Sequence, residues 1–114
     1  MSDATNKMGC AGYHGKQALE QFQQDAQNLI LVEFVAPHCA SCETLAPVLE
    51  QLAAEHLGKI HLVKIDMTEE VELAIELGVR NAPTVILFQG TTVLEKVGGL
   101  KPQKMYADII QKVL

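Results

Sequence analysis

The chain has 114 residues, a mass of 12.4 kDa and a formal net charge of −5. The acidic balance and an aromatic content of only 4% exclude the basic, base-stacking surface that a nucleic-acid binder needs. Hydrophobic residues make up 48% of the chain and charged residues 20%, which is typical of a globular domain. The length fits one domain and leaves no room for a flavin or nicotinamide domain. We therefore expect no cofactor, and any NADPH-dependent step falls to another polypeptide.

Three cysteines are too few for a disulfide scaffold. The sequence has no run of about 18 apolar residues, so we expect no membrane span. Residues 1–7 lack the apolar core of a signal peptide, which makes the cytoplasm the expected compartment. In that compartment a C-x-x-C pair such as Cys39 and Cys42 is more often catalytic or metal-binding than structural.

In chain order, residues 1–15 are polar and rich in glycine, and we expect them to form a flexible N-terminal arm. Residues 16–28 carry apolar side chains at helical spacing and predict a short amphipathic helix. The near-continuous apolar run of residues 29–36 indicates a strand buried on both faces. A long helix is predicted over residues 39–56, followed by a second strand over residues 60–65.

The second half of the chain predicts a short helix, a hairpin and a last helix. The short helix begins at Thr68. Residues 84–88 and 91–97 form two strands joined by a turn at residues 89–90, which predicts an antiparallel hairpin. Pro102 opens the last helix. The apolar residues of this helix that we expect to face inward are Met105, Tyr106, Ile109, Ile110 and Val113.

The predicted order of elements is α-β-α-β-α-β-β-α, with a ragged first strand in the arm as an alternative. The two strands that flank the long helix must be parallel and joined by a right-handed crossover. The hairpin adds antiparallel strands, so the sequence predicts an α/β fold with a central mixed sheet and helices on both faces. Residues 16–114 form the expected domain.

Cys39 and Cys42 stand where the first buried strand ends and the long helix begins. At a helix N-terminus, unpaired backbone N–H groups and the helix dipole favour the thiolate, the form of cysteine that attacks a disulfide. Cys42 lies one turn deeper on the same helical face, so the pair predicts an exposed attacking thiol and a shielded partner. The alternatives are two incidental cysteines or half of a metal site, with Cys10, His14 and His38 as the nearby candidates for the missing ligands.

Three further side chains have a possible chemical role. Glu33 interrupts the most apolar strand, where burial would raise its pKa and let it accept a proton from Cys42. A solvent-facing glutamate is the alternative for this position. His38 adjoins Cys39 and is either a cation that favours the thiolate or a solvated surface side chain. Cys10 is either an incidental thiol or a site of oxidation, glutathionylation or dimer linkage.

Residues 34–42, Phe-Val-Ala-Pro-His-Cys-Ala-Ser-Cys, resemble the active-site segment of the thioredoxin family, which usually reads F-W-A-x-W-C-G-P-C. The similarity continues at residues 45–47, 63–66, 78–84 and 97–99 and is collinear over residues 16–114. The segment before Cys39 is also similar to the S-P-T-C-G-P-C variant found in thioredoxin domains fused to NADPH-dependent thioredoxin reductases. The resemblance implies the thioredoxin fold.

The resemblance also implies roles for individual residues. Cys39 would be the attacking cysteine and Cys42 the resolving one, and the two would form a disulfide when oxidised. Glu33 stands where the family keeps a buried acid, usually Asp, that assists the second cysteine. Pro83 matches the cis-proline opposite the thiols. The residues implied in substrate binding are His38, Ala82, Pro83 and Gly98, with Ala82 offering backbone hydrogen bonds.

The sequence departs from the family pattern at several of these positions. His38 replaces the usual Trp before the first cysteine, which changes the substrate-facing surface. Ala40 and Ser41 replace Gly-Pro between the cysteines, where residues tune the reduction potential. Glu43 stands where a Lys or Arg is common. Leu62 stands where many members have a lysine that pairs with the buried acid, so we expect that acid to lack a cationic partner.

These inferences predict a monomeric thiol–disulfide oxidoreductase that reduces protein disulfides through Cys39 and Cys42. A separate reductase of the thioredoxin reductase type would restore the dithiol, and neither nucleic acid nor membrane is an expected partner. The alternative is a binding or redox-sensing module that keeps the fold but has weak or no general reductase activity. The missing Trp, the altered dipeptide and Cys10 motivate that alternative.

Overall fold

The computed structural model describes residues 12–114 and contains a five-stranded sheet with the strand order β1-β3-β2-β4-β5. The strands are β1 (Tyr13–His14), β2 (Leu29–Val35), β3 (Ile60–Asp66), β4 (Thr84–Gln89) and β5 (Thr92–Gly98). β1 and β2 both pair with β3 in parallel, whereas β4 is antiparallel to β2 and to β5. The predicted mixed sheet is therefore confirmed.

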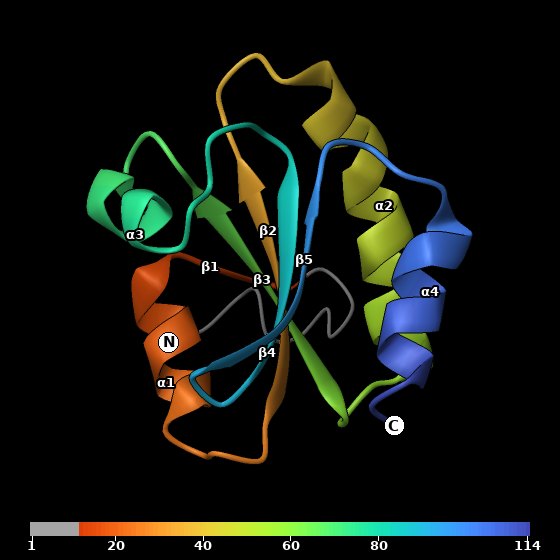
Figure 1. Cartoon of the computed structure of the whole chain (residues 1–114). Helices are drawn as coiled ribbons and strands as arrows, with labels where there is room; N and C mark the ends of the chain where they lie inside the picture. The colour runs from red at the N-terminus through yellow and green to blue at the C-terminus, as the bar shows by residue number, and fades with distance from the viewer. Residues whose placement is uncertain (1–11) are drawn as a thin grey trace.

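The helices cover both faces of the sheet, as predicted. They are α1 (Lys16–Gln23), α2 (Ala40–Glu55), α3 (Val71–Glu76) and α4 (Gln103–Gln111). α1 and α3 lie on one face, and α2 and α4 lie on the other (Figure 1). Within residues 12–114, no helix combines the length and the apolar composition of a membrane span.

β2 supplies both hydrophobic cores because its side chains alternate between the two faces. Leu29 and Leu31 belong to the core under α2 and α4. Ile30 and Phe34 belong to the core under α1 and α3. The same alternation directs Glu33 to the α2–α4 side.

The folded domain begins earlier than the sequence predicts. Residues 12–15 were expected to belong to the arm, but Tyr13 pairs with Val63 of β3, and the Gly15 N–H donates to the Lys64 carbonyl at 2.9 Å. Gly12 is buried at a φ of 85°, and a Cβ there would lie 2.9 Å from the Leu62 carbonyl oxygen. The rest of the expected arm, including Cys10, lies outside the described residues.

Side chains that bind the backbone explain two differences in helix length. α1 ends at Gln23, five residues before the predicted end, and the Asn28 side chain donates to the Phe22 carbonyl at 2.8 Å. α3 begins at Val71 rather than Thr68. There the Asp66 carboxylate accepts from the Thr68 N–H at 2.8 Å and from its hydroxyl at 2.6 Å, which holds a turn before the helix.

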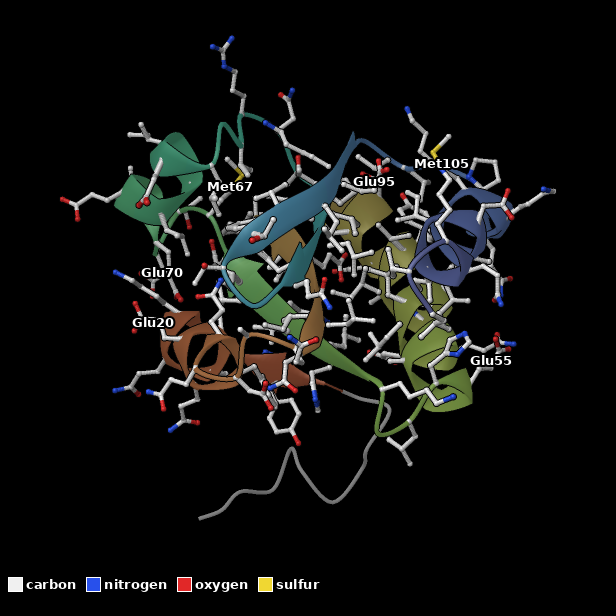
Figure 2. The ribbon with its side chains drawn as sticks, turned by 60° about the horizontal axis from the view of Figure 1, so that its bottom comes forward. Glu20, Glu55, Met67, Glu70, Glu95 and Met105 are labelled. Carbon is white, nitrogen blue, oxygen red and sulfur yellow. A yellow bond between two sulfur atoms is a disulfide. The ribbon has the colours of Figure 1, made fainter. Side chains whose placement is uncertain are left out.

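The hairpin turn and α4 also differ from the prediction. Gln89 pairs with Thr92, so the turn falls at residues 90–91. Tyr106 and Ile110 are buried four residues apart, and Ile109 is partly buried against the same core. Met105 and Val113, expected to face inward, are 40% and 36% exposed, and Figure 2 shows Met105 on the outer side of α4. Tyr106 and Ile110, with the partly buried Ala107 and Ile109, hold this short helix on the sheet.

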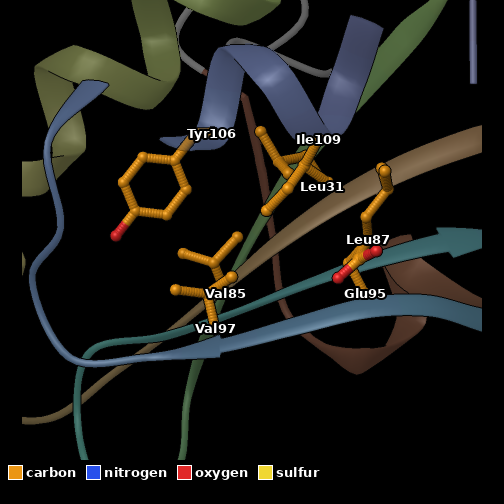
Figure 3. A pocket seen from close by; sticks show the side chains of 7 residues that line it. All are labelled: Leu31, Val85, Leu87, Glu95, Val97, Tyr106 and Ile109. Carbon is orange, nitrogen blue, oxygen red and sulfur yellow. The ribbon is translucent and has the colours of Figure 1, made fainter. Parts of the chain in front are cut away.

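α4 packs over β4 and β5 and leaves a cavity of about 10 Å³ between them. Figure 3 shows its lining side chains, which are Leu31, Val85, Leu87, Glu95, Val97, Tyr106 and Ile109. The Tyr106 hydroxyl points away from this cavity toward the loop between β5 and α4. There it accepts from the Lys101 N–H at 3.1 Å and donates to the Gly99 carbonyl at 3.3 Å. The cavity is too small for a ligand, and Tyr106 holds the loop.

Replacing Tyr106 by Phe removes both of these hydrogen bonds while the ring stays packed. We expect the Tyr106→Phe variant to lose about 1 kcal/mol of unfolding free energy, the usual net value of such bonds. Urea denaturation measures this difference. Tyr13→Phe is the matched control, because no hydrogen bond to its hydroxyl is found within residues 12–114. Equal unfolding free energies for the two variants would contradict the role of the Tyr106 hydroxyl.

Candidate active site

The two cysteines of the C-x-x-C pair lie at the junction of β2 and α2 and are joined by a disulfide. Their Cα atoms are 5.2 Å apart. Cys39 is the N-cap residue of α2 and is partly exposed. Cys42 lies in the first turn of the helix and is only 5% exposed. The accessible outer sulfur and the shielded inner sulfur agree with the prediction from the spacing.

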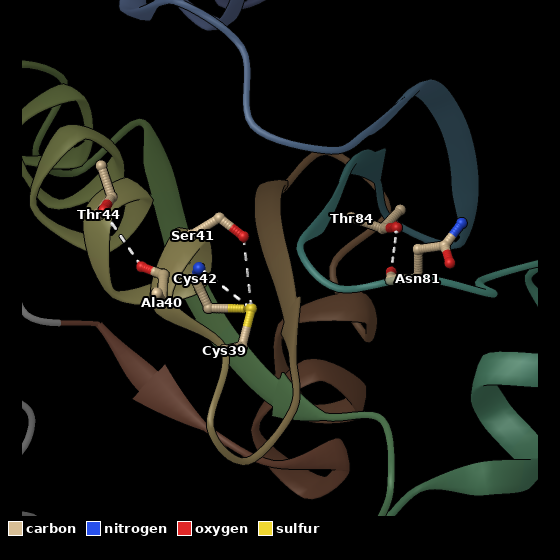
Figure 4. The surroundings of a disulfide bond; sticks show 7 residues. All are labelled: Cys39, Ala40, Ser41, Cys42, Thr44, Asn81 and Thr84. Atoms are coloured by element: carbon tan, nitrogen blue, oxygen red, sulfur yellow. Dashed lines mark hydrogen bonds between the residues drawn. A yellow bond between two sulfur atoms is a disulfide. The ribbon is translucent and has the colours of Figure 1, made fainter.

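Two donors from the first turn of α2 reach the Cys39 sulfur. The Cys42 N–H donates to it at 3.1 Å, and the Ser41 hydroxyl lies 3.6 Å away (Figure 4). A disulfide sulfur carries no hydrogen, so the Ser41 hydroxyl is the donor. When the disulfide is reduced, these donors and the helix dipole favour the thiolate form of Cys39 over the thiol.

Glu33 is fully buried, at 0% exposure, on the sheet face that α2 and α4 cover. Within residues 12–114, neither of its carboxylate oxygens has a hydrogen-bond partner. Burial raises the pKa of Glu33 to about 7, while the nearby Lys64 lowers it and Glu50 raises it further. The solvent-facing alternative is therefore wrong. The carboxyl group exchanges its proton near neutral pH, on the side of the sheet where α2 buries Cys42.

Lys64, a residue that the sequence analysis missed, is the cationic neighbour of Glu33. The sequence comparison put Leu62 at the position of the paired lysine and predicted no such neighbour. In the structure Lys64 of β3 stands directly opposite Glu33 of β2, whereas Leu62 stands opposite Leu31. The expectation was wrong because the register of β3 against β2 decides which residue faces the acid. The signal was present in the sequence, since Lys64 is the sole lysine of this strand.

A pocket of about 300 Å³ connects Lys64 with the two cysteines. Its lining residues are Val35, Ala36, Cys39, Cys42, Glu43, Ala46 and Lys64. The pocket places one cation and one exposed carboxylate beside the disulfide. Within residues 12–114, no three His, Cys, Asp or Glu side chains are grouped as metal ligands would be. Cys10, one of the candidate ligands of the metal alternative, lies outside that range.

Pro83 reaches the same edge of the sheet as Cys39. The Ala82-Pro83 peptide bond is cis, as the resemblance implies. Pro83 directly precedes Thr84, which pairs with Phe34 near the end of β2 and with Gly98 at the end of β5. The Gly99 N–H donates to the Pro83 carbonyl at 2.8 Å. The proline and the end of β5 thus form one continuous rim beside the loop that leads to Cys39.

Lys96 and Thr84 hold the segment that leads to Pro83. The Lys96 ammonium donates to the carbonyls of Leu77 and Gly78 at 3.1 Å and 2.8 Å. The Thr84 hydroxyl donates to the Asn81 carbonyl at 2.7 Å (Figure 4). Both ends of the loop between α3 and β4 are therefore fixed. The sequence analysis missed Lys96 because nothing in the spacing of the chain relates it to residues 18 and 19 positions earlier.

His38 is exposed and has a φ of 59°, in the left-handed region that few residues other than glycine adopt. Within residues 12–114, the hydrogen bonds to the Cys39 sulfur come from Ser41 and Cys42 and not from His38. Its ring therefore belongs to the outer surface before the disulfide. Gly98 is also exposed, and Ala82 is partly exposed.

Comparison with known proteins identifies the class. The thioredoxin family model matches residues 13–112. Thioredoxin C-2 from Corynebacterium nephridii is 39% identical over 98 residues, which cover 82% of this chain and 91% of that protein. NADPH-dependent thioredoxin reductase 3 from Arabidopsis thaliana is 31% identical over 99 residues, which cover 87% of this chain and 19% of that protein. The solved structure of a mutant thioredoxin from Halobacterium salinarum superposes with a TM-score of 0.78 and 32% identity, covering 90% of this chain and 88% of that one.

A C-x-x-C disulfide at the N-terminus of a helix, on this mixed sheet, defines a thiol–disulfide oxidoreductase with the thioredoxin fold. The chain belongs to the thioredoxin family.

The buried Glu33 makes stability depend on pH. Its pKa rises from 4.5 to about 7 on folding, so between these values the folded state binds the proton that the unfolded state releases. Stability therefore falls as pH rises through this window, by about 3 kcal/mol in total. In Glu33→Gln this part of the fall is absent, and urea denaturation from pH 4 to 8 measures the difference from wild type. Glu76→Gln, at an exposed position, should follow wild type. Parallel curves for Glu33→Gln and wild type would refute the assignment.

Proposed function

We propose that this oxidoreductase reduces disulfides in partner proteins. In the first step, the Cys39 thiolate attacks one sulfur of the substrate disulfide. A mixed disulfide forms between Cys39 and the substrate, and the other substrate sulfur leaves as a thiolate. The partial exposure of Cys39 and the two hydrogen-bond donors at its sulfur support this role.

In the second step, the Cys42 thiol gives its proton to the Glu33 carboxylate and attacks the Cys39 sulfur. The mixed disulfide breaks, the second substrate sulfur leaves as a thiolate, and the Cys39–Cys42 disulfide remains. Two electrons have then passed from the dithiol to the substrate. The burial of Cys42 and a Glu33 pKa of about 7 support this assignment, because a base of that pKa is half-ionised at the working pH.

We place the substrate against the rim formed by Ala82, Pro83 and Gly98, with His38 at the outer edge. Ala82 is partly exposed just before the cis bond and offers its backbone groups to an extended substrate segment. The bonds from Lys96 and Thr84 keep the loop in place before substrate arrives. Backbone groups can bind a substrate segment whatever its side chains are. This rim therefore suits substrates that have a disulfide in common but differ in sequence.

The dithiol is restored by a separate reductase of the thioredoxin reductase type, and the protein works as a cytoplasmic monomer in cell redox homeostasis. The similarity to part of the Arabidopsis NADPH-dependent thioredoxin reductase supports such a donor. That protein is named as a reductase, and one segment of it, 19% of its length, is similar to this chain. In this proposed electron transport, electrons pass from NADPH to the reductase, then to the Cys39–Cys42 pair, and finally to protein disulfides.

Single cysteine variants test the two steps. In a Cys10→Ser background, Cys39→Ser should abolish disulfide reduction, because the remaining Cys42 thiol is buried and cannot reach a substrate disulfide. Cys42→Ser should instead accumulate a covalent adduct with substrate, because the mixed disulfide cannot be resolved. Insulin reduction and non-reducing gels coupled to mass spectrometry measure the two outcomes.

Full activity of Cys39→Ser would overturn the assignment of the attacking cysteine. Cys10→Ser alone should match wild type. If the wild-type protein showed negligible turnover but formed a stable complex with a partner, the binding-module alternative would be favoured instead.

The rate of the second step should follow the ionisation of Glu33. In the wild-type protein we expect resolution of the mixed disulfide to accelerate as pH rises through about 7, because the ionised carboxyl accepts the Cys42 proton. Glu33→Gln removes this acceptor and should slow the step by about 100-fold near neutral pH. Single-turnover release of substrate thiol measures this rate. A wild-type inflection that persists in Glu33→Gln would show that another group accepts the proton.

A further inference from the structure

We propose that the Ser41 hydroxyl stabilises the Cys39 thiolate by donating a hydrogen bond to it, and that this residue makes the dithiol a weaker reductant than the same site without the hydroxyl. The inference rests on the proposed function, since it concerns the sulfur that attacks the substrate. It assigns a role to one of the two residues between the cysteines, where the sequence departs from the usual Gly-Pro of the family.

The position of Ser41 carries the proposal. Ser41 is half-buried in the first turn of α2, and its Oγ lies 3.6 Å from the Cys39 Sγ. Figure 4 shows the hydroxyl directed at the sulfur from the same turn that provides the Cys42 N–H. The proline usual at this position in the family has neither a hydroxyl nor a backbone N–H. This chain therefore has a donor at a place where the family segment provides none.

The other polar groups near the sulfur do not replace this donor. The second hydroxyl of the turn, on Thr44, donates to the Ala40 carbonyl at 3.1 Å and stays within the helix. Glu43 is exposed in the same turn and brings a negative charge, which opposes a thiolate. Lys64 lines the pocket beside the cysteines but stands opposite the buried Glu33. Ser41 thus supplies the side-chain hydrogen bond that reaches the sulfur directly.

The hydroxyl acts unequally on the two redox states. In the disulfide the Cys39 sulfur is neutral and a weak acceptor, whereas in the dithiol it is a thiolate, and hydrogen bonds to charged groups are stronger. Reduction by glutathione converts two glutathione thiols and the Cys39–Cys42 disulfide into glutathione disulfide and the protein dithiol. Because Ser41 stabilises the dithiol side, it shifts this equilibrium toward the reduced protein. A protein whose reduced form is stabilised gives up its electrons less readily.

The test compares Ser41→Ala with two matched variants. Ser41→Thr keeps a hydroxyl at the same place, and Thr44→Ala removes a hydroxyl from the same turn that bonds only to Ala40. Two quantities are measured on each protein in a Cys10→Ser background. One is the pH titration of the Cys39 thiolate by its ultraviolet absorbance, and the other is the equilibrium constant with glutathione.

We expect Ser41→Ala to raise the pKa of Cys39 and to shift the glutathione equilibrium toward the disulfide by about three- to tenfold, the net value of a single ordinary hydrogen bond, because the 3.6 Å contact to sulfur is long. Ser41→Thr should retain the wild-type behaviour, and Thr44→Ala should change neither quantity. Unchanged titration and equilibrium in Ser41→Ala would overturn the proposal. So would an equal change in Thr44→Ala, because the effect would then come from the stability of the helix turn.

These readouts are independent of disulfide reduction in protein substrates. If wild type reduces insulin and Ser41→Ala titrates as wild type does, the role of Ser41 fails and the proposed function stands. If wild type fails to reduce insulin but Ser41→Ala shifts both quantities, the role of Ser41 stands and the proposed function fails.

Discussion

The double burial of strand β2 is the constraint on which the rest of the structure depends. β2 has a strand partner along each edge and a pair of helices over each face, so both its backbone and its side chains are fixed. The chain leaves this strand at Val35 and reaches the helix cap at Cys39 within four residues. The sulfur is therefore held close to a strand that is packed on both faces and paired on both edges, while the loop that carries it is open to solvent. A disulfide that reacts with another protein in one orientation needs both a fixed position and access from solvent.

The parts of the fold that could be predicted are those encoded by neighbouring residues in the sequence. The apolar run of β2, the cysteine spacing and the hairpin are local patterns, and the structure confirms the elements that they predict. The failures come from contacts that residue type and spacing do not reveal, most of them between distant segments and one within a single turn. Pairing of Tyr13 with Val63 ordered residues assigned to the arm, and the bonds of Asp66 to Thr68 delayed the start of α3. The outward position of Met105 follows from the packing of α4, which buries Tyr106 and Ile110 against the sheet.

The residues of the candidate site also fall into two groups, those that the sequence predicts and those that only the folded structure reveals. Cys39 and Cys42 are recognisable from spacing, and Glu33 stands out because a carboxylate in an apolar strand has a desolvation cost. Lys64 was misjudged because strand register, and not distance along the chain, brings it opposite Glu33. Lys96 acts through two hydrogen bonds and Ser41 through one, and their geometry appears only when the chain is folded. Residue type and spacing thus predict which atoms react, whereas the groups that tune and position them require coordinates.

Glu33 has no hydrogen-bond partner among residues 12–114, and this is best understood as a condition of its proposed role. A donor within bonding distance would hold the carboxylate ionised and lower its pKa, and the group would no longer take up a proton near neutral pH. An entirely apolar environment without Lys64 would raise the pKa further and keep the acid protonated. Lys64 opposes the effect of burial from the neighbouring strand without binding the carboxyl oxygens, and the pKa settles at about 7. The destabilisation that accompanies ionisation is then inseparable from the proposed proton transfer, because both arise from the same buried charge.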